Sequence, residues 1–77
     1  MKDWRTYIES KPSVMYGKPV IKNTRIPVDL ILEKLSKGET IDDLLLAYPR
    51  LKKEEVLAAL AFASDSIKNE IVIPVAS

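Results

Sequence analysis

Hydrophobic residues recur at intervals of three and four through the middle of the chain, which is the spacing of one face of an α-helix. The first such segment follows Pro27, which suits the first turn of a helix because its missing N–H is not needed there. Gly38 suits the end of the same helix. The pattern predicts a helix over residues 27–37, with a stripe made of Val28, Ile31, Leu32 and Leu35.

A second helix is predicted over residues 40–48. Its first residue, Thr40, can accept a hydrogen bond from the backbone N–H of Asp43, and Asp42 and Asp43 lie at the positive end of the helix dipole. Pro49 ends the helix. Its stripe consists of Ile41, Leu44, Leu45 and Tyr48.

The longest predicted helix covers residues 53–69, with Glu54 and Glu55 in its first turn. A helix that is apolar all round is buried or lies at an interface, and the middle of this one is close to that condition. One stripe consists of Val56, Leu60, Ala63 and Ile67, and the other apolar residues are Leu57, Ala58, Ala59, Ala61 and Phe62.

The segment before these helices favours β-structure. Two short apolar runs, at residues 14–15 and 20–21, flank Gly17 and Pro19, so we expect a β-hairpin over residues 13–22. Further upstream, Trp4 and Ile8 are four apart, which fits one helical turn that lays the Trp4 ring over the core.

The last segment, EIVIPVAS at residues 70–77, is an apolar, strand-like tail. The expected fold is therefore mainly α, in a single domain over residues 1–77. A short N-terminal β-hairpin precedes a three-helix core, and the tail follows it. The second and third helices, joined by the YPRL turn, have the lengths of a helix-turn-helix.

Composition narrows the class of protein. A 77-residue domain has little core, and the chain lacks Cys and His, so disulfides and the common zinc sites are excluded and oligomerisation is the remaining way to add stability. No stretch approaches the roughly 18 apolar residues of a membrane span, and no signal peptide is evident. We therefore expect a cytoplasmic protein that does not enter a membrane.

The net charge of +1 is unevenly distributed. Residues 1–28 hold six basic and two acidic side chains, a balance of +4, whereas residues 29–77 hold six basic and nine acidic ones, a balance of −3. A polyanion would prefer the N-terminal part.

Catalysis is not expected. The chain has no Cys nucleophile, no His base and no glycine-rich phosphate loop. The adjacent pairs Asp42-Asp43 and Glu54-Glu55 point to different sides of a helix, and the helix dipole explains them. Neither a cofactor, a metal site nor a small-molecule substrate is evident.

Arg25 is the sharpest candidate contact residue. Held between a turn and Pro27, its guanidinium would suit a phosphate or a carboxylate of a partner. The alternative is a structural role, in which Arg25 pairs with Asp29 or donates to carbonyls of the hairpin.

Two kinds of macromolecular partner remain open. Duplex DNA would meet the start of the third helix, although Glu54 and Glu55 oppose this and the alanine-rich stretch offers little to read bases. The candidate nucleic-acid contacts are Lys18, Lys22, Arg25, Arg50, Lys52 and Lys53.

A protein partner is favoured by the apolar stretch at residues 57–62, which exceeds what two short helices can cover and predicts a homodimer. The tail could add a strand to a sheet edge of a partner, or close against the hairpin of its own chain. The candidate partner contacts are Arg25, Leu57, Ala61, Phe62, Ile71, Val72, Ile73 and Val75.

The segments GKPVIKNTRIPV and AYPRL, in this order and followed by an alanine-rich helix, resemble the family known as domain of unknown function 433. The resemblance covers about residues 13–64. Asn23 replaces the usual Gly before the Thr-Arg pair, but Asn tolerates a left-handed backbone. Lys52 replaces a Thr or Ser cap of the third helix, and Glu54 and Glu55 partly compensate for the lost cap.

The resemblance implies a helix-turn-helix-like fold, and many family members resemble antitoxins encoded beside PIN-like nuclease toxins. The chain is therefore expected to bind and inhibit a PIN-like ribonuclease and to contact its own promoter DNA. The alternatives are a DNA-binding regulator without a toxin and a homodimeric interaction module of neither kind.

Overall fold

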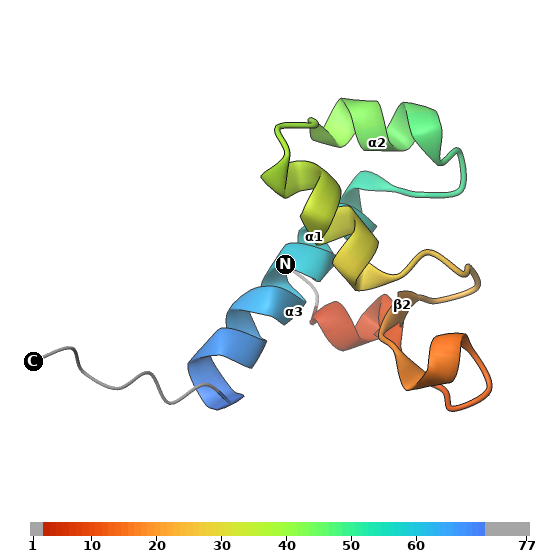
Figure 1. Ribbon diagram of the computed structural model, residues 1–77, viewed down its shortest axis with the longest axis vertical. Coiled ribbons are helices and arrows are strands. Elements are labelled where there is room, and N and C mark those ends of the chain that lie inside the picture. The colour runs from red at the N-terminus through yellow and green to blue at the C-terminus, as the bar shows by residue number, and fades with distance from the viewer. Residues whose placement is uncertain (1–2, 71–77) are drawn as a thin grey trace, which may run out of the picture.

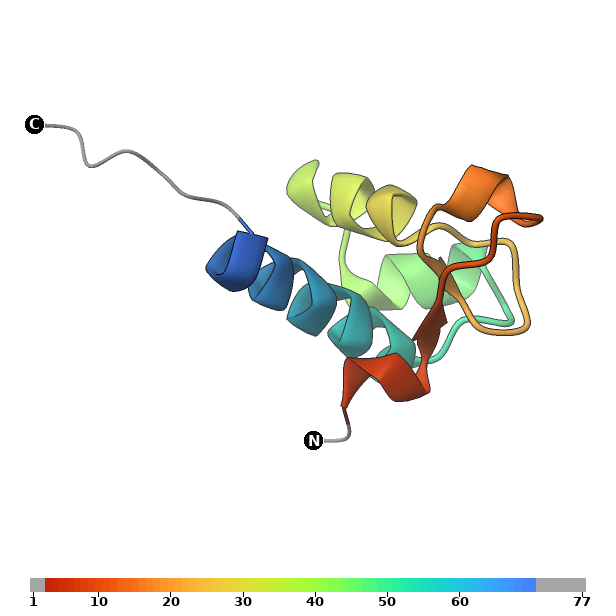
Figure 2. The ribbon, with the colours of Figure 1, turned by 90° about the horizontal axis from the view of Figure 1, so that it is seen from below.

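Three α-helices enclose one apolar core in the computed structural model, which describes residues 3–70 of the chain (Figures 1 and 2). The mainly α fold with an N-terminal antiparallel strand pair is thus confirmed. The elements in order are the 3₁₀ turn η1 (Trp4–Thr6), strand β1 (Ile8–Glu9), the 3₁₀ turn η2 (Met15–Gly17), strand β2 (Val20–Ile21), and helices α1 (Val28–Ser36), α2 (Ile41–Ala47) and α3 (Lys53–Glu70).

The helix bounds agree with the predictions apart from the capping residues. Pro27 and Lys37 cap α1, and the following Gly38 has a φ of +94°, the left-handed conformation that glycine supplies at a helix end. Thr40 and Tyr48 cap α2. Helix α3 begins at Lys53, as predicted, and includes Glu70, which the sequence pattern assigned to the tail.

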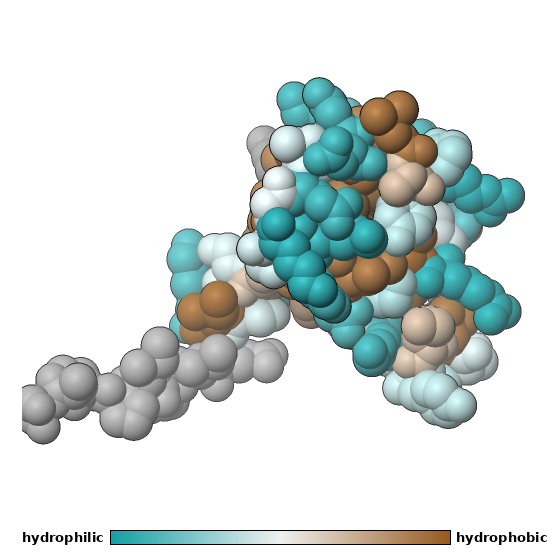
Figure 3. Space-filling model, turned by 45° about the horizontal axis from the view of Figure 1, so that its top comes forward, coloured by the Kyte–Doolittle hydropathy of each residue, from teal (hydrophilic) through white to brown (hydrophobic). Residues whose placement is uncertain are grey.

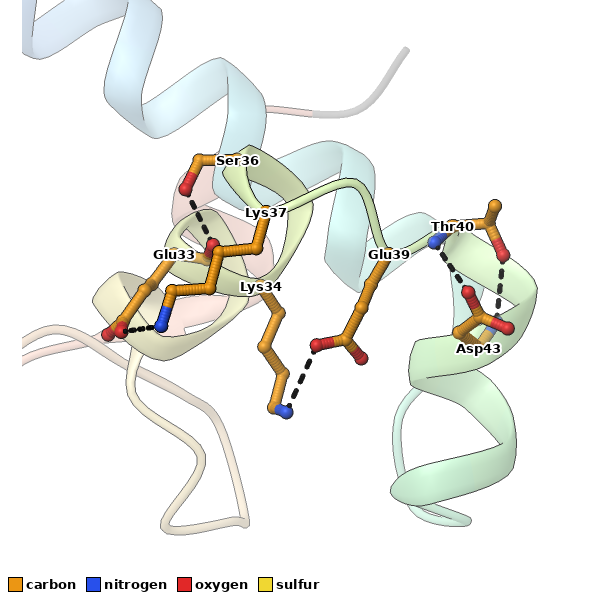
Figure 4. Close-up of polar contacts among 7 residues, drawn as sticks. All are labelled: Glu33, Lys34, Ser36, Lys37, Glu39, Thr40 and Asp43. Atoms are coloured by element: carbon orange, nitrogen blue, oxygen red, sulfur yellow. Dashed lines mark hydrogen bonds and ion pairs between the residues drawn. The ribbon is translucent and has the colours of Figure 1, made fainter.

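The start of α2 is closed by a capping box (Figure 4). The backbone N–H of Asp43 donates to the Thr40 hydroxyl at 3.1 Å, and the backbone N–H of Thr40 donates to the Asp43 carboxylate at 2.8 Å. Just before it, Lys34 at the end of α1 pairs with Glu39 at 3.3 Å. The α1–α2 connection is therefore held to α1 by an ion pair and to α2 by the capping box.

The strand pair differs from the predicted hairpin over residues 13–22. Its first strand is β1, with Ile8 opposite Ile21 and Glu9 opposite Val20, so the prediction of a strand at residues 14–15 is wrong. Met15 and Tyr16 have φ values of 53° and 58°, which an extended strand does not allow. Ile8 is only 5% exposed. The burial of this residue against the core favours the register in which it lies opposite Ile21.

The core lies between β2 and the three helices. The largest fully buried side chains are Ile21, Ile31, Leu44, Val20, Val28 and Val56. Ala58 and Ala59 are also completely buried, because small side chains let α3 approach its neighbours closely. No described helix is long and apolar enough to cross a membrane.

Trp4 closes one side of this core, as predicted. Its ring meets Phe62 edge to face, with 4.9 Å between centroids and 81° between planes. Its indole N–H donates to Asp65 at 2.7 Å. The N-terminal segment is thereby attached to α3 through both an aromatic contact and a hydrogen bond.

Candidate anion-binding site

The loop between β2 and α1 is held by its own hydrogen bonds. The Ile21 N–H donates to the Ile26 carbonyl at 3.0 Å, and the Thr24 hydroxyl donates to the Ile21 carbonyl at 2.7 Å while accepting from the Ile26 N–H at 3.0 Å. Asn23 has a φ of 62°, so it takes the left-handed position that the family fills with Gly, as expected. The backbone that carries Arg25 is therefore well fixed.

The corner between α2 and α3, residues 48–52, forms the other half of the site. Leu51 is buried in the core, and its N–H donates to the Tyr48 carbonyl at 2.8 Å. Arg50 and Lys52, on either side of this anchor, are exposed. The corner thus directs two cations toward solvent.

Two adjoining hollows bring the loop and the corner together. The first has a volume of about 460 Å³ and the second of about 340 Å³, and both are lined by Asn23, Thr24 and Arg50. Lys11 and Arg25 line the first, and Lys22 and Lys52 line the second. We call these five cations the basic cluster: Lys11, Lys22, Arg25, Arg50 and Lys52.

The cluster keeps an excess of positive charge. Only two acidic residues line the hollows, and Glu9 lies 3.7 Å from Lys11. The other, Glu55, accepts a hydrogen bond from the backbone N–H of Lys52 at 2.8 Å. Five cations against two anions leave a local balance of +3, so the surface favours an anionic ligand or partner.

Four of the six predicted nucleic-acid contacts meet in this cluster: Lys22, Arg25, Arg50 and Lys52. The other two do not line it. Lys18 forms an exposed ion pair with Asp29 at 2.9 Å, and Lys53 lies in the first turn of α3.

The pairing of Arg25 with Asp29, one of the alternatives left open by the sequence, is not found. Asp29 accepts from Lys18 instead, and Arg25 makes no ion pair with any residue in the described range 3–70. Its guanidinium is thus available to an outside group.

Lys11 was missed from the sequence. It follows β1 by two positions, and only the pairing of β1 with β2 brings it to the β2–α1 loop. No local motif marks it.

The predicted partner contacts on α3 differ in how accessible they are to a partner. Leu57 and Ala61 are half-buried, and Phe62 has an internal contact with Trp4. The stripe of Val56, Leu60, Ala63 and Ile67 does not face the core as a whole, because Leu60 is 43% exposed and Ile67 is 54% exposed. The tail contacts Ile71, Val72, Ile73 and Val75 lie outside the described residues.

Comparison with known proteins identifies the family. The family model described as a protein of unknown function, DUF433, matches residues 8–63. The crystal structure of a DUF433 member from Anabaena variabilis shares 33% identity and superposes with a TM-score of 0.74, covering 79% of this chain and 60% of that one. An uncharacterised protein of Sinorhizobium fredii, y4eO, is 30% identical over 59 residues.

These 59 residues are 77% of this chain but only 27% of y4eO, so the chain spans about a quarter of that relative. The matched segment runs from β1 through most of α3 and includes the β2–α1 loop and the corner. The chain therefore belongs to the DUF433 family, whose function is unknown.

Proposed function

We propose that this domain is the antitoxin of a toxin–antitoxin pair and inhibits a PIN-like ribonuclease by direct binding, with the basic cluster facing the acidic residues around the metal site of the nuclease. The observation that carries the proposal is the convergence of five cations from three separate segments on two adjoining hollows. The resemblance of many family members to antitoxins supplies the class of partner.

Arg25 is the central contact in this proposal. Its backbone is fixed by the hydrogen bonds of Thr24, and its side chain is exposed and pairs with none of residues 3–70. A guanidinium binds a carboxylate through two parallel N–H···O bonds. A fixed backbone also reduces the conformational entropy that binding must overcome.

The surface of α3 favours a protein over DNA as the partner. A recognition helix reads bases through polar side chains near its N-terminus. The outer face of α3 offers Lys53 and Glu54, and then the apolar Leu57, Leu60 and Ala61. Beyond its first turn, such a face offers few of the donors and acceptors that sequence-specific readout needs.

Contact with duplex DNA is the second candidate, because α2, the corner and α3 have the order and short turn of a helix-turn-helix and the corner contributes Arg50 and Lys52. Binding would then depend mainly on phosphates. If all five cations met phosphates, affinity would fall about 500-fold between 50 and 200 mM salt. Fluorescence anisotropy with a labelled duplex at these two salt concentrations measures this fall.

The antitoxin proposal is tested in two steps. The tagged chain is first purified from its native cells and bound proteins are identified by mass spectrometry. Cleavage of a fluorescent single-stranded RNA by the recovered nuclease is then titrated with the untagged domain. We expect cleavage to stop near a one-to-one ratio. Recovery of no nuclease, or full cleavage in the presence of a large excess of the domain, would contradict the proposal.

A further inference from the structure

The outer face of α3 carries exposed apolar side chains at the spacing of a coiled-coil seam. Leu57, Leu60, Ser64 and Ile67 follow one another at intervals of three, four and three residues, the seam of a two-stranded coiled coil. Leu60 and Ile67 are 43% and 54% exposed, well above what is usual for residues that pack in a core. A hydrophobic patch is visible beside the C-terminal end of α3 (Figure 3).

The fold of the chain itself leaves this seam uncovered. The residues of α3 that pack inward are Val56, Ala58 and Ala59, all completely buried. At 100° per residue, the seam is centred about 120° around the helix from these three residues, and Ile67 is its member nearest to the buried Val56. Leu60, Ser64 and Ile67 are exposed, and Leu57 is half-buried.

Charges at the border of the seam indicate how a second copy would lie. Glu54 and Lys68 flank the seam on the same side as Ala61, each seven residues from it. Both are exposed, and neither forms an ion pair within the described part of the chain. An antiparallel pair with its two-fold axis level with residue 62 places Glu54 of each copy about 3 Å, measured along the helix axis, from Lys68 of the other.

We propose that α3 pairs with its copy in this antiparallel register, with Leu57 opposite Ile67 and Leu60 opposite Ser64. A parallel pair would instead place Lys53 against its own copy in the seam, which is unfavourable for like charges. The self-complementary charges therefore select a second copy in one orientation.

The register also separates the two basic clusters. Each cluster lies at the N-terminal end of its α3, and an 18-residue helix is about 27 Å long. An antiparallel dimer thus carries one cluster at each end of the helix pair. Dimerisation and the proposed function use different surfaces, so either can fail without the other.

Sedimentation equilibrium over a range of concentrations tests the register, with four variants of the full chain. Leu60→Glu places a charge in the seam and should raise the dimer dissociation constant at least about tenfold. Glu54→Lys and Lys68→Glu should each raise it about fivefold, since each change sets like charges together twice per dimer. The double variant E54K/K68E restores opposite pairing and should return the constant to within about twofold of the wild type.

Glu33→Lys on α1 is the matched control, because it makes the same charge change on an exposed helix position away from the seam. Circular dichroism confirms that each variant is folded. A monomer at all concentrations would overturn the dimer. A dimer that resists Leu60→Glu, or additive weakening in the double variant, would overturn this register.

Discussion

The starts of α2 and α3 satisfy their free backbone N–H groups to different extents. At α2, Thr40 and Asp43 exchange two hydrogen bonds, so two exposed backbone N–H groups are satisfied. At α3 the reciprocal pair is Lys52 and Glu55, and only one bond forms, from the Lys52 N–H to the Glu55 carboxylate. A lysine side chain has no acceptor, so the other half of the capping box is missing.

Lys52 therefore weakens the capping of α3 and at the same time adds a positive charge to the second hollow. Ser or Thr would complete the box at residue 52, yet the lysine found there lines the second hollow with Lys22 and Arg50. A position that breaks a local rule of helix stability and joins a candidate site is what a functional constraint would produce. The next four predictions test whether the two helix starts differ in this sense.

The largest effect is expected from Thr40→Ala. It removes the acceptor for the Asp43 N–H and should lower the free energy of unfolding by about 1 kcal/mol. For a domain of this size the melting temperature should fall by about 4–8 °C. Thermal unfolding followed by circular dichroism measures this, and Ser36→Ala near the end of α1 is the control, with a shift of at most about 2 °C.

Lys52→Ser should act in the opposite direction. It completes the capping box with Glu55 and removes a positive charge from the positive end of the α3 dipole. The free energy of unfolding should therefore rise by about 0.5–1 kcal/mol. The same variant should bind an anionic partner more weakly. Urea unfolding and partner titration together measure both effects, and a variant that gains stability with unchanged binding would separate Lys52 from the site.

Glu55→Ala tests the acceptor of the capping bond at the start of α3. It removes the one capping bond of α3 and should lower the free energy of unfolding by about 0.5 kcal/mol. It also removes one of the two acidic side chains that line the hollows, so anion binding should tighten. Stability and binding are measured as for Lys52→Ser. A fall in both would show that Glu55 supports the shape of the site rather than opposing its charge.

The smallest effect is expected from pH. Hydrogen bonds from the backbone and the side chain of Thr40 lower the pKa of Asp43. Because the folded pKa is the lower one, the stabilisation by this carboxylate is complete above its unfolded pKa and is lost as the pH falls through the folded value. Wild type should therefore lose more stability than Asp43→Asn between about pH 5 and pH 2 in urea unfolding. Equal losses would contradict this role.

The three helices could be predicted to within their caps because their signals are local. Thr40, Pro27 and Gly38 each act within one helical turn, and a stripe at a period of 3.6 residues needs no distant partner. The strand pair could not, because Ile8 and Ile21 meet across 12 intervening residues. An apolar run such as residues 14–15 carries no information on which segment it joins.

The distinction between local and long-range signals also explains which residues of the basic cluster could be predicted. Lys22 and Arg25, and Arg50 and Lys52, are close in sequence and were identified, whereas Lys11 depends on the pairing of β1. The sequence did not decide which face of α3 packs inward, because the middle of this helix is apolar on most sides and a stripe through Leu60 was as consistent with the sequence as one through Ala59. Burial by Trp4 and by the other helices decided between them.

The central claim is that Arg25 and the cations around it bind an acidic nuclease. The most direct test is the dissociation constant of the complex with the recovered nuclease, measured by calorimetry for Arg25→Glu and for the matched reversal Lys18→Glu outside the basic cluster. We predict a loss of at least about 100-fold for Arg25→Glu and of at most about threefold for Lys18→Glu. Equal losses, or an unchanged constant for Arg25→Glu, would contradict the claim.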